Sequence, residues 1–497
     1  MSHSRNLIKQ IEALACENCL LKINNGSLRE ENERLRGECA RLKGLTEAEI
    51  MAAAECQAAP LRLEISALEA VVADMGAEIH RLNAIINKDS TNSSKPPRTD
   101  GFKAIQNNRE KGARKRGGQP GHVGHSLKIP ENLDRLIEEG KAVKRLVDYT
   151  NGAEVFISKW VVDVEIKTVY TEIRYPTDVL LPPELSPEVV YGNGIKALAV
   201  LLEQEGVVAI KRISGLFSTI TGGLVAPSKA SIESFFSQFA ASIDGDIAAI
   251  RVDLLDGPVI NTDDTPMRCA ETCEYDNNGA ATLKTAEGKT FSATVRTYSN
   301  EKSTLFTINP KKDDEGIVRD GMLILYCGIL GHDHEIKFYK YTLLHATCCE
   351  HLCRDLKGLR VLFYIQWADI FRAFLYEMNS YKKKRLADGK DSCDADILNE
   401  FMDRYDTLVA AGNSVFQSMS PKKFGYDELR KMLARLRDYK DAYTLFIRDF
   451  TAPFTNNLAE RDLRSCKTRQ NISGCFRTWR GISDYVKSKS VISTWKK

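Results

Sequence analysis

The chain has 497 residues, of which 43% are apolar, and this length predicts several domains with buried cores. Its 70 basic and 67 acidic residues leave a net charge of only +3, so the overall charge excludes no class of partner. Apolar runs such as 195–202 are too short to span a bilayer, which argues against a membrane protein. The 13 cysteines follow no repeating framework and no signal peptide is evident, so we expect reduced thiols in a cytoplasm.

Two heptad patterns mark residues 1–88. Leucine recurs every seven residues over 14–42, and asparagines alternate with it in the seam (Asn18, Asn25 and Asn32). A second, more apolar seam covers 61–86, and Pro60 is expected to separate the two helices. Such seams are typical of coiled coils, in which a buried asparagine fixes the register. We expect a homodimer through this coiled coil, and a helical hairpin within one chain is the alternative.

Residues 89–128 predict a basic linker. They are rich in Ser, Asn, Pro and Gly, a composition that cannot bury a core. The excess of basic residues suits a segment that follows a DNA backbone without reading its sequence. The candidate contacts lie in one basic run (Lys111, Arg114, Lys115 and Arg116). A solvated tether is the alternative.

Two further regions precede the acidic stretches. Residues 129–185 contain an alternation of apolar and polar residues, which predicts a small β-rich module. Residues 186–252 change to helical spacing, and short helices joined by tight turns suit a DNA-binding region with Lys211 and Arg212 as contacts. A plain helical connector fits the second region equally well.

The stretch GPVINTDDTPMR, residues 257–268, places two acids at the end of an apolar strand. We expect the strand to stop at Thr265 and Pro266, because proline cannot donate to a sheet ladder. Asp263 is the candidate ligand, and Asp264 is expected to face the other side of the strand. Taken alone, the stretch also fits an Asp-rich turn.

Two later stretches strengthen the case for a metal site. In GILGHDHEIKFYKY, residues 328–341, a short apolar run ends at Asp333. In FTNNLAERDLR, residues 454–464, Asn456 or Asn457 is a good helix N-cap, which places Glu460 in the first turn of a predicted helix. Three carboxylates without a fourth protein ligand suit Mg²⁺, or Mn²⁺, which keeps waters and binds phosphate. The pattern therefore predicts two such ions and phosphodiester transfer, with Asp263, Asp333 and Glu460 as ligands.

As a set, these stretches resemble the DDE transposases of bacterial insertion sequences, in particular the IS66 family. The resemblance extends over roughly residues 90–497 and keeps the family order of motifs. It includes SSKPP at 93–97, GGQPGHVGH at 117–125, a long helical run at 191–236 and a basic tail at 473–497. The three acidic stretches lie between the helical run and the tail. The chain departs from the family by having no cysteine over 129–160 and by Asp264, where the family commonly has glutamate.

The resemblance implies a multidomain α+β protein. It would combine the N-terminal coiled coil, the β module and the helical region with an RNase H-like α/β catalytic domain at 253–465 and a basic tail at 466–497. That fold would place Asp263 on the first strand and Asp333 at the end of the fourth. We expect one strand over 322–333, further strands earlier in this domain, and a helix over 343–362. The long interval before Glu460 predicts a helical insertion at about 370–450.

Other residues are candidates for supporting roles. His351 and Arg354 share a helix face and, with Asn457, could hold a phosphate or assist proton transfer; a plain polar helix face is the alternative. After Glu460, basic residues interleave with aromatic ones and suit a DNA end (Arg461, Arg464, Lys467 and Arg477). A zinc site at His345, Cys349 and Cys353 is not expected, because three ligands on one helix usually need a fourth from elsewhere.

The sequence thus predicts a transposase that cuts and joins the ends of an insertion sequence, with DNA as substrate and partner. The family implies accessory proteins encoded alongside. An inactive DNA-binding or coiled-coil scaffold is the alternative from another class, and a nuclease that cuts without joining shares the predicted metal site.

Overall fold

The computed structural model describes residues 2–41, 47–89, 92–93, 129–147, 159–162, 166–176, 180, 187–276, 281–285 and 290–497. The chain forms two compact units. The larger comprises Met1–Ile105, Leu180–Leu216 and Ala226–Lys497, and the smaller comprises Gln106–Val179 and Phe217–Val225. The elements that carry the three predicted acids all belong to the larger unit.

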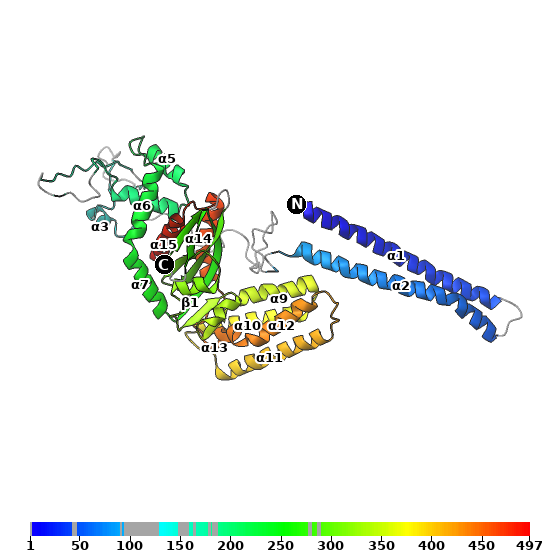
Figure 1. Cartoon of the computed structure of the whole chain (residues 1–497). Helices are drawn as coiled ribbons and strands as arrows, with labels where there is room; N and C mark the ends of the chain where they lie inside the picture. Colours follow the sequence, from blue (N-terminus) through cyan, green and yellow to red (C-terminus); the bar gives the residue numbers. More distant parts are fainter. Residues whose placement is uncertain are drawn as a thin grey trace. The chain divides into compact units, whose positions relative to one another are not determined.

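The first two helices, α1 (Ser2–Arg41) and α2 (Glu47–Asn87), pack side by side along their heptad seams (Figure 1). The seam side chains are less exposed than their neighbours, and Asn18 Nδ2 donates a 3.3 Å hydrogen bond to the carbonyl oxygen of Val72. The structure therefore contains the hairpin within one chain. Self-association through these helices stays a prediction.

Pro60 does not separate the two helices, contrary to our expectation, because α2 continues through it. A proline inside a helix removes a hydrogen bond and costs about 3 kcal/mol or more. The seam nevertheless continues on both sides, with Ala58 only 1% exposed and Leu61 half-buried. We attribute the unbroken helix to this packing.

Five strands form the central sheet in the order β5-β4-β1-β6-β7. The antiparallel part pairs β1 with β4 and β4 with β5, whereas β6 runs parallel to β1 and β7 parallel to β6. Their bounds are β1 Val259–Cys269, β4 Phe291–Ser299, β5 Thr304–Asn309, β6 Ile329–His332 and β7 Leu344–Thr347. A separate two-stranded hairpin consists of β2 (Glu271–Tyr275) and β3 (Ala281–Thr285).

The first strand is longer than the sequence predicts. It continues through Pro266 to Cys269 as a partner of β4, whereas its pairing with β6 ends at Asn261. Between Asn261 and the isolated bridge of Cys269 to Phe476, this edge of β1 pairs with no strand among the described residues, and proline is tolerated on such an edge. The two acids therefore lie inside a strand, at the place where it loses its parallel neighbour.

Two other boundaries differ from expectation. The strand expected over 322–333 is reduced to β6, because Met322–Leu325 forms a turn closed by a 3.1 Å hydrogen bond from Leu325 N to Met322 O. The helix expected from Leu343 begins only at α9 (Cys349–Phe363), since β7 comes first. Four residues are too few for hydrophobic periodicity to separate a strand from a helix.

Helices on either side of the strands complete the fold. The last helix, α15, packs on β5, and α14 packs on β1 and β4. Buried side chains of α7, β1 and α15 share one core, and those of β4, α14 and α15 share another. The bounds are α4 Asn193–Gln204, α5 Ile210–Ile220, α6 Lys229–Ser242, α7 Asp244–Asp256, α8 Asp314–Asp320, the 3-10 helix η3 Ile336–Lys340, α14 Asn457–Ser473 and α15 Trp479–Trp495.

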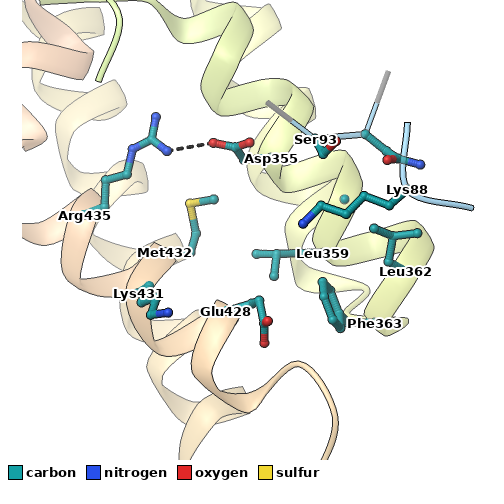
Figure 2. A pocket seen from close by; sticks show the side chains of 12 residues that line it. Lys88, Ser93, Asp355, Leu359, Leu362, Phe363, Glu428, Lys431, Met432 and Arg435 are labelled. Carbon is teal, nitrogen blue, oxygen red and sulfur yellow. Dashed lines mark hydrogen bonds and ion pairs between the residues drawn. The ribbon is translucent and has the colours of Figure 1, made fainter. Parts of the chain in front are cut away.

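Four helices fill the interval between α9 and α14, the region expected to be a helical insertion. They are α10 (Trp367–Ala387), α11 (Ala395–Gln417), α12 (Tyr426–Asp438) and α13 (Lys440–Arg448). Figure 2 shows Arg435 of α12 reaching to Asp355 of α9, and their 2.7 Å ion pair borders a cavity of 540 Å³. This contact ties the four helices to the helix that follows the sheet.

The region expected to be β-rich has a different structure where it is described. Over 129–147, 159–162 and 166–176 the chain forms one short helix, α3 (Leu133–Glu138), and no strand. Alternating residues such as Val161 and Val169 are highly exposed there. Alternation alone therefore does not build a sheet in these stretches. Most of the basic linker lies outside the described residues.

Among the described residues, no helix combines the length and apolar character that crossing a membrane requires.

Candidate functional site

The three predicted acids come from three elements that converge beside the sheet. Asp263 lies within β1, opposite Thr297 of β4. Asp333 directly follows β6, the parallel neighbour of β1, and Glu460 lies in the first turn of α14, which packs on β1. Adjacent parallel strands bring their carboxyl ends to the same edge of a sheet, which explains why Asp263 and Asp333 are close. We call Asp263, Asp333 and Glu460 the acid group.

Asp333 and Glu460 lie close to Cys348 and His351, two residues at the start of α9. The donor atoms of Asp333, Cys348, His351 and Glu460 all lie within 4.8 Å of one another. His351 Nδ1 is 3.0 Å from Asp333 Oδ1 and 3.7 Å from Glu460 Oε1. We call these four residues the four-donor cluster. It brings together two predicted ligands, one predicted supporting residue and a cysteine.

Three atoms of this cluster are buried without a hydrogen-bond partner: Asp333 Oδ1, His351 Nδ1 and Glu460 Oε1. They face one another at short range without hydrogen-bond geometry. A buried polar atom without a partner costs about 1–3 kcal/mol, so such atoms in a native protein call for an explanation. A bound cation would satisfy the two carboxylate oxygens.

Asp263 is buried, and burial disfavours the ionised form of its carboxylate. Burial and, to a smaller extent, the charge of Asp333 together raise its pKa to about 7, against a hydrogen bond from the backbone N–H of Asp264. That bond is 2.8 Å long, and the charge of Lys467 on α14 also favours the ionised form. A buried carboxylate whose ionisation is disfavoured by a neighbouring carboxylate is typical of a site that binds a cation.

His351 offsets part of the charge on Asp333. Burial alone would raise the pKa of Asp333, but His351, Asn456 and Arg354 outweigh it and the pKa is lowered. Burial likewise works against the charged form of His351, yet its contacts with Asp333 and Cys348 raise its pKa to about 11. The imidazole is therefore positively charged at neutral pH when no metal competes for it.

The backbone around the cluster is joined by a buried asparagine. Asn456 Nδ2 donates a 2.8 Å hydrogen bond to the carbonyl oxygen of Thr262, next to Asp263, and its backbone N–H donates to Cys348 Sγ at 3.2 Å. Asn456 is 1% exposed, whereas Asn457, the residue predicted to assist, is exposed at the start of α14. Asn456 thus links the ends of β1, α9 and α14.

Cys348 and Asn456 were missing from the predicted site. The sequence did carry a signal for Cys348, because this cysteine precedes His351 by three residues and Arg354 by six, which is helical spacing. For Asn456 the signal pointed to a helix cap, but its side chain makes no capping hydrogen bond. Its partners are distant in sequence, so only the fold reveals its role.

Asp264 faces away from the acid group, as expected for the next residue on a strand. Its carboxylate lies 2.7 Å from Lys312 Nζ, 2.8 Å from Lys337 Nζ and 3.7 Å from Arg296 NH2. Burial would raise its pKa, but the two lysines outweigh that effect and the pKa is lowered. Asp264 therefore belongs to a buried network of charges and not to the acid group.

The predicted DNA contacts lie in different parts of the chain. Arg461, Arg464 and Lys467 are exposed on α14 at intervals of three residues, directly after Glu460, and Arg477 is exposed in the segment after that helix. Lys211 and Arg212 are exposed on α5. The four candidates of the linker, Lys111, Arg114, Lys115 and Arg116, lie outside the described residues.

The zinc arrangement considered for His345, Cys349 and Cys353 has no counterpart among the described metal-binding groups. His345 Nδ1 is instead 3.0 Å from His332 Nε2, on β7 and not on a helix. Cys349 is fully buried and its Sγ donates to the carbonyl oxygen of Tyr443 at 3.5 Å. Packing and hydrogen bonding account for these residues.

Comparison with known proteins gives few matches. No curated protein sequence matches this chain. Among solved structures, the Drosophila P element transposase strand transfer complex is 11% identical with a TM-score of 0.33, over 63% of this chain and 94% of that chain.

Two family models match. A family of unknown function, DUF6444, covers residues 41–128. The transposase IS66 family covers residues 188–484, a stretch that includes the whole acid group. Because that match spans more than half of the sequence, the chain belongs to the IS66 family of transposases.

Proposed function

We propose that this transposase cleaves and joins the ends of its insertion sequence by metal-dependent phosphodiester transfer, and that the acid group carries the reaction. The observation that supports this proposal most is the convergence of Asp333 and Glu460 in one cluster, beside an Asp263 that responds to the charge of Asp333. The acids come from elements far apart in sequence, and such convergence is more typical of a site than of structural ion pairs.

The sheet supports the assignment of an RNase H-like catalytic domain. Its strands, numbered by their order in the chain without the β2–β3 hairpin, are arranged 3-2-1-4-5, with the first three antiparallel and the last two parallel to the first. In this arrangement the first acid lies on the central strand and the second follows the fourth. The α10–α13 helices would then be an insertion before the helix that carries the third acid.

The residues of the acid group fit a hard divalent cation. Carboxylate oxygens are the ligands that Mg²⁺ prefers, and Asp333 Oδ1 and Glu460 Oε1 are buried without a hydrogen-bond donor. Asp263, Asp333 and Glu460 would hold two Mg²⁺ ions, with Mn²⁺ as a substitute. Bound there, the ions would activate the attacking water or 3′-hydroxyl and offset charge on the departing oxygen.

The neighbouring residues would position the substrate and the acids. Asn456 fixes the start of α14 against β1, so that Glu460 stays near Asp333. His351 lies 3.0 Å from Asp333 and could donate a hydrogen bond to a phosphate oxygen. Arg354, half-buried on the same helix, adds a second cation whose charge reaches Asp333.

DNA would approach along the exposed face of α14. Arg461, Arg464 and Lys467 follow Glu460 on that helix, and cations at this spacing suit successive phosphates. Arg477 would extend the contact, and Lys211 and Arg212 on α5 would contact DNA elsewhere. We also propose that the linker cations (Lys111, Arg114, Lys115 and Arg116) bind the backbone without sequence preference.

The decisive experiment measures cleavage and strand transfer on labelled DNA that carries the element ends, with Mg²⁺, for the wild type and Glu460→Gln. We expect Glu460→Gln to lose both products while it still binds DNA. Glu233→Gln, a change on the exposed face of α6, is the matched control and should keep both activities. Unchanged activity of Glu460→Gln would refute its place in the site, and cleavage without joining by the wild type would indicate a nuclease.

Self-association and accessory proteins remain separate proposals. The seams of α1 and α2 face each other in one chain, and two hairpins could still combine into a larger bundle. Light scattering on the full chain and on a chain that lacks residues 1–88 tests this point. An equal oligomeric state for both would show that the hairpin is not the dimerisation element.

A further inference from the structure

The four-donor cluster contains two kinds of ligand that a magnesium site does not need. Two of its members, Cys348 and His351, offer sulfur and nitrogen, whereas Mg²⁺ takes oxygen ligands and leaves a thiolate unused. Thiolate and imidazole are instead the ligands of zinc and related ions. The mechanism proposed above assigns no chemistry to the Cys348 thiol.

The spacing of the four donors fits one tetrahedral ion. Bond lengths of about 2.0–2.3 Å place the donors around a zinc ion at about 3.3–3.8 Å from one another. His351 Nδ1 lies 3.0 Å from Asp333 Oδ1 and 3.7 Å from Glu460 Oε1, and the whole set, with Cys348 Sγ, lies within 4.8 Å. Small side-chain rotations would therefore suffice to surround a single ion.

The elements that carry these donors are held firmly. Cys348 caps α9, its backbone N–H donates to the carbonyl oxygen of His332 at 2.9 Å, and His351 lies one turn along the same helix. The backbone N–H of Asn456 donates to Cys348 Sγ at 3.2 Å, a contact that stabilises a thiolate. The sulfur is thus oriented toward the cluster by the segment that also fixes Glu460.

Access and unpartnered atoms point the same way. Cys348 is 1% exposed, whereas the side chains of Asp333 and Glu460 are 32% and 22% exposed, so an ion would enter past the carboxylates and meet the sulfur last. Asp333 Oδ1, His351 Nδ1 and Glu460 Oε1 are buried and have no hydrogen-bond partner. One cation would bind the nitrogen and both carboxylate oxygens at once, in place of the 3.0 Å ion pair between His351 Nδ1 and Asp333 Oδ1.

We propose that Asp333, Cys348, His351 and Glu460 form a binding site for a thiophilic divalent cation of the zinc class. Binding would release the proton of the Cys348 thiol and one proton of the His351 imidazolium to solvent, and the ion would take their place. The same ion would occupy Asp333 and Glu460, two of the three carboxylates assigned to Mg²⁺. Zinc would therefore inhibit DNA cleavage, a consequence that rests on the proposed function, whereas the binding itself does not.

The binding test uses the full chain, stripped of metal by a chelator, with a non-thiol reductant and no DNA. Co²⁺ is the probe, because thiolate ligation produces a near-ultraviolet charge-transfer band. We expect a saturable band that Zn²⁺ abolishes, that is lost in Cys348→Ser and that is kept in Cys327→Ser, an exposed thiol elsewhere. A band of equal strength in Cys348→Ser, or no band in the wild type, would overturn the proposal.

A second variant covers the case in which Cys348→Ser does not fold. His351→Gln keeps the buried thiol but removes the imidazole, so its affinity for Co²⁺ should fall by at least about tenfold. Circular dichroism confirms that each variant is folded before titration. An unchanged Co²⁺ affinity in folded His351→Gln would show that the histidine is only an ion-pair partner of Asp333, which also overturns the proposal.

The functional arm measures inhibition separately from activity. Zn²⁺ is added to Mg²⁺-supported cleavage, and each protein is compared with its own rate without zinc. We expect the wild type to need at least about tenfold less Zn²⁺ for half inhibition than Cys348→Ser. Metal binding without any cleavage would count against the proposed function alone, whereas cleavage with equal zinc sensitivity in both proteins would count against the zinc site.

Discussion

Asp263 and Asp264 are neighbours on β1 but lie in opposite electrostatic surroundings. Asp264 has two lysines within 2.8 Å and an arginine nearby, and its pKa is lowered. Asp263 is buried near the charge of Asp333, and its pKa rises to about 7 although the backbone N–H of Asp264 and the charge of Lys467 favour its ionised form. One strand thus presents a compensated carboxylate on one side and an uncompensated carboxylate on the other.

The number of cations beside each carboxylate distinguishes an acid that is paired within the fold from one that is available to bind a cation. The protein supplies cations to Asp264, whereas Asp263 is the acid that we propose binds a cation from solution. Arg296, fully buried beside Asp264, forms ion pairs with Asp264 and Asp320, so the charges on this side of the strand are paired within the protein. Substitutions on the two sides should therefore change different properties.

The largest expected effect is on activity. Asp263→Asn should lower the rate of DNA cleavage by about 10³-fold or more, because it removes a proposed metal ligand. It should leave the free energy of unfolding unchanged or slightly higher, because it also removes repulsion between Asp263 and Asp333. Cleavage rates and urea unfolding of the same preparation check both halves. Loss of folding in this variant would contradict the contrast.

Asp264→Asn should have the opposite profile. It leaves Lys337 and Arg296 buried without their full complement of negative charge, and breaking such a network costs about 3 kcal/mol. Urea unfolding gives the magnitude, with Asp263→Asn as the matched control on the same strand. A loss below about 1 kcal/mol would mean that the network contributes little to stability.

The buried lysine Lys382 tests the effect of burial on a cation, whose pKa burial lowers, whereas burial raises the pKa of a carboxylate. Burial lowers the pKa of Lys382 to about 8 from an ordinary value of 10.5, and its Nζ donates to the carbonyl oxygen of Ala452 at 2.6 Å. Between these pH values the unfolded chain holds a proton that the folded chain has lost, so stability rises with pH, by up to about 3 kcal/mol.

Chemical unfolding across this pH range measures the effect for the wild type and for Lys382→Met, which should lack the increment. Lys383→Met, on the exposed side of the same helix, is the control and should follow the wild type. Parallel pH profiles for the wild type and Lys382→Met would refute the lowered pKa.

The smallest expected effect separates the two lysines of Asp264. The side chain of Lys337 is 11% exposed and that of Lys312 is 48% exposed. Lys337→Met should cost about 2 kcal/mol, because it breaks a buried pair, whereas Lys312→Met should cost about 0.5 kcal/mol, because water already screens that contact. Thermal and urea unfolding of both variants give the comparison, and equal losses would show that burial does not decide the contribution.

Local patterns in the sequence predicted the positions of the acids but not their surroundings. Apolar runs before Asp263 and Asp333 correctly indicated strands there, and the asparagines before Glu460 correctly indicated the start of a helix. Strand ends were less predictable, because the fate of Pro266 depended on where β6 stops pairing. Such a boundary is set by a partner strand and leaves no local signal.

The parts of the site that escaped prediction depend on contacts between distant residues. Asn456 joins Cys348 and Thr262, which are 108 and 194 residues away from it in the chain. The heptads of α1 and α2 were recognised, yet a seam fits a partner in the same chain as well as one in another. Periodicity defines which face is buried and does not identify what buries it.

The position of α14 and α15 late in the chain has a consequence for synthesis on the ribosome. A nascent chain that has reached α13 already contains Asp263 and Asp333 but has not yet made Glu460 or the helix that covers β5. Any product that ends before residue 457 would lack one acid and leave apolar strand surface uncovered. Premature termination should therefore yield fragments that cannot cut DNA and that proteases remove readily.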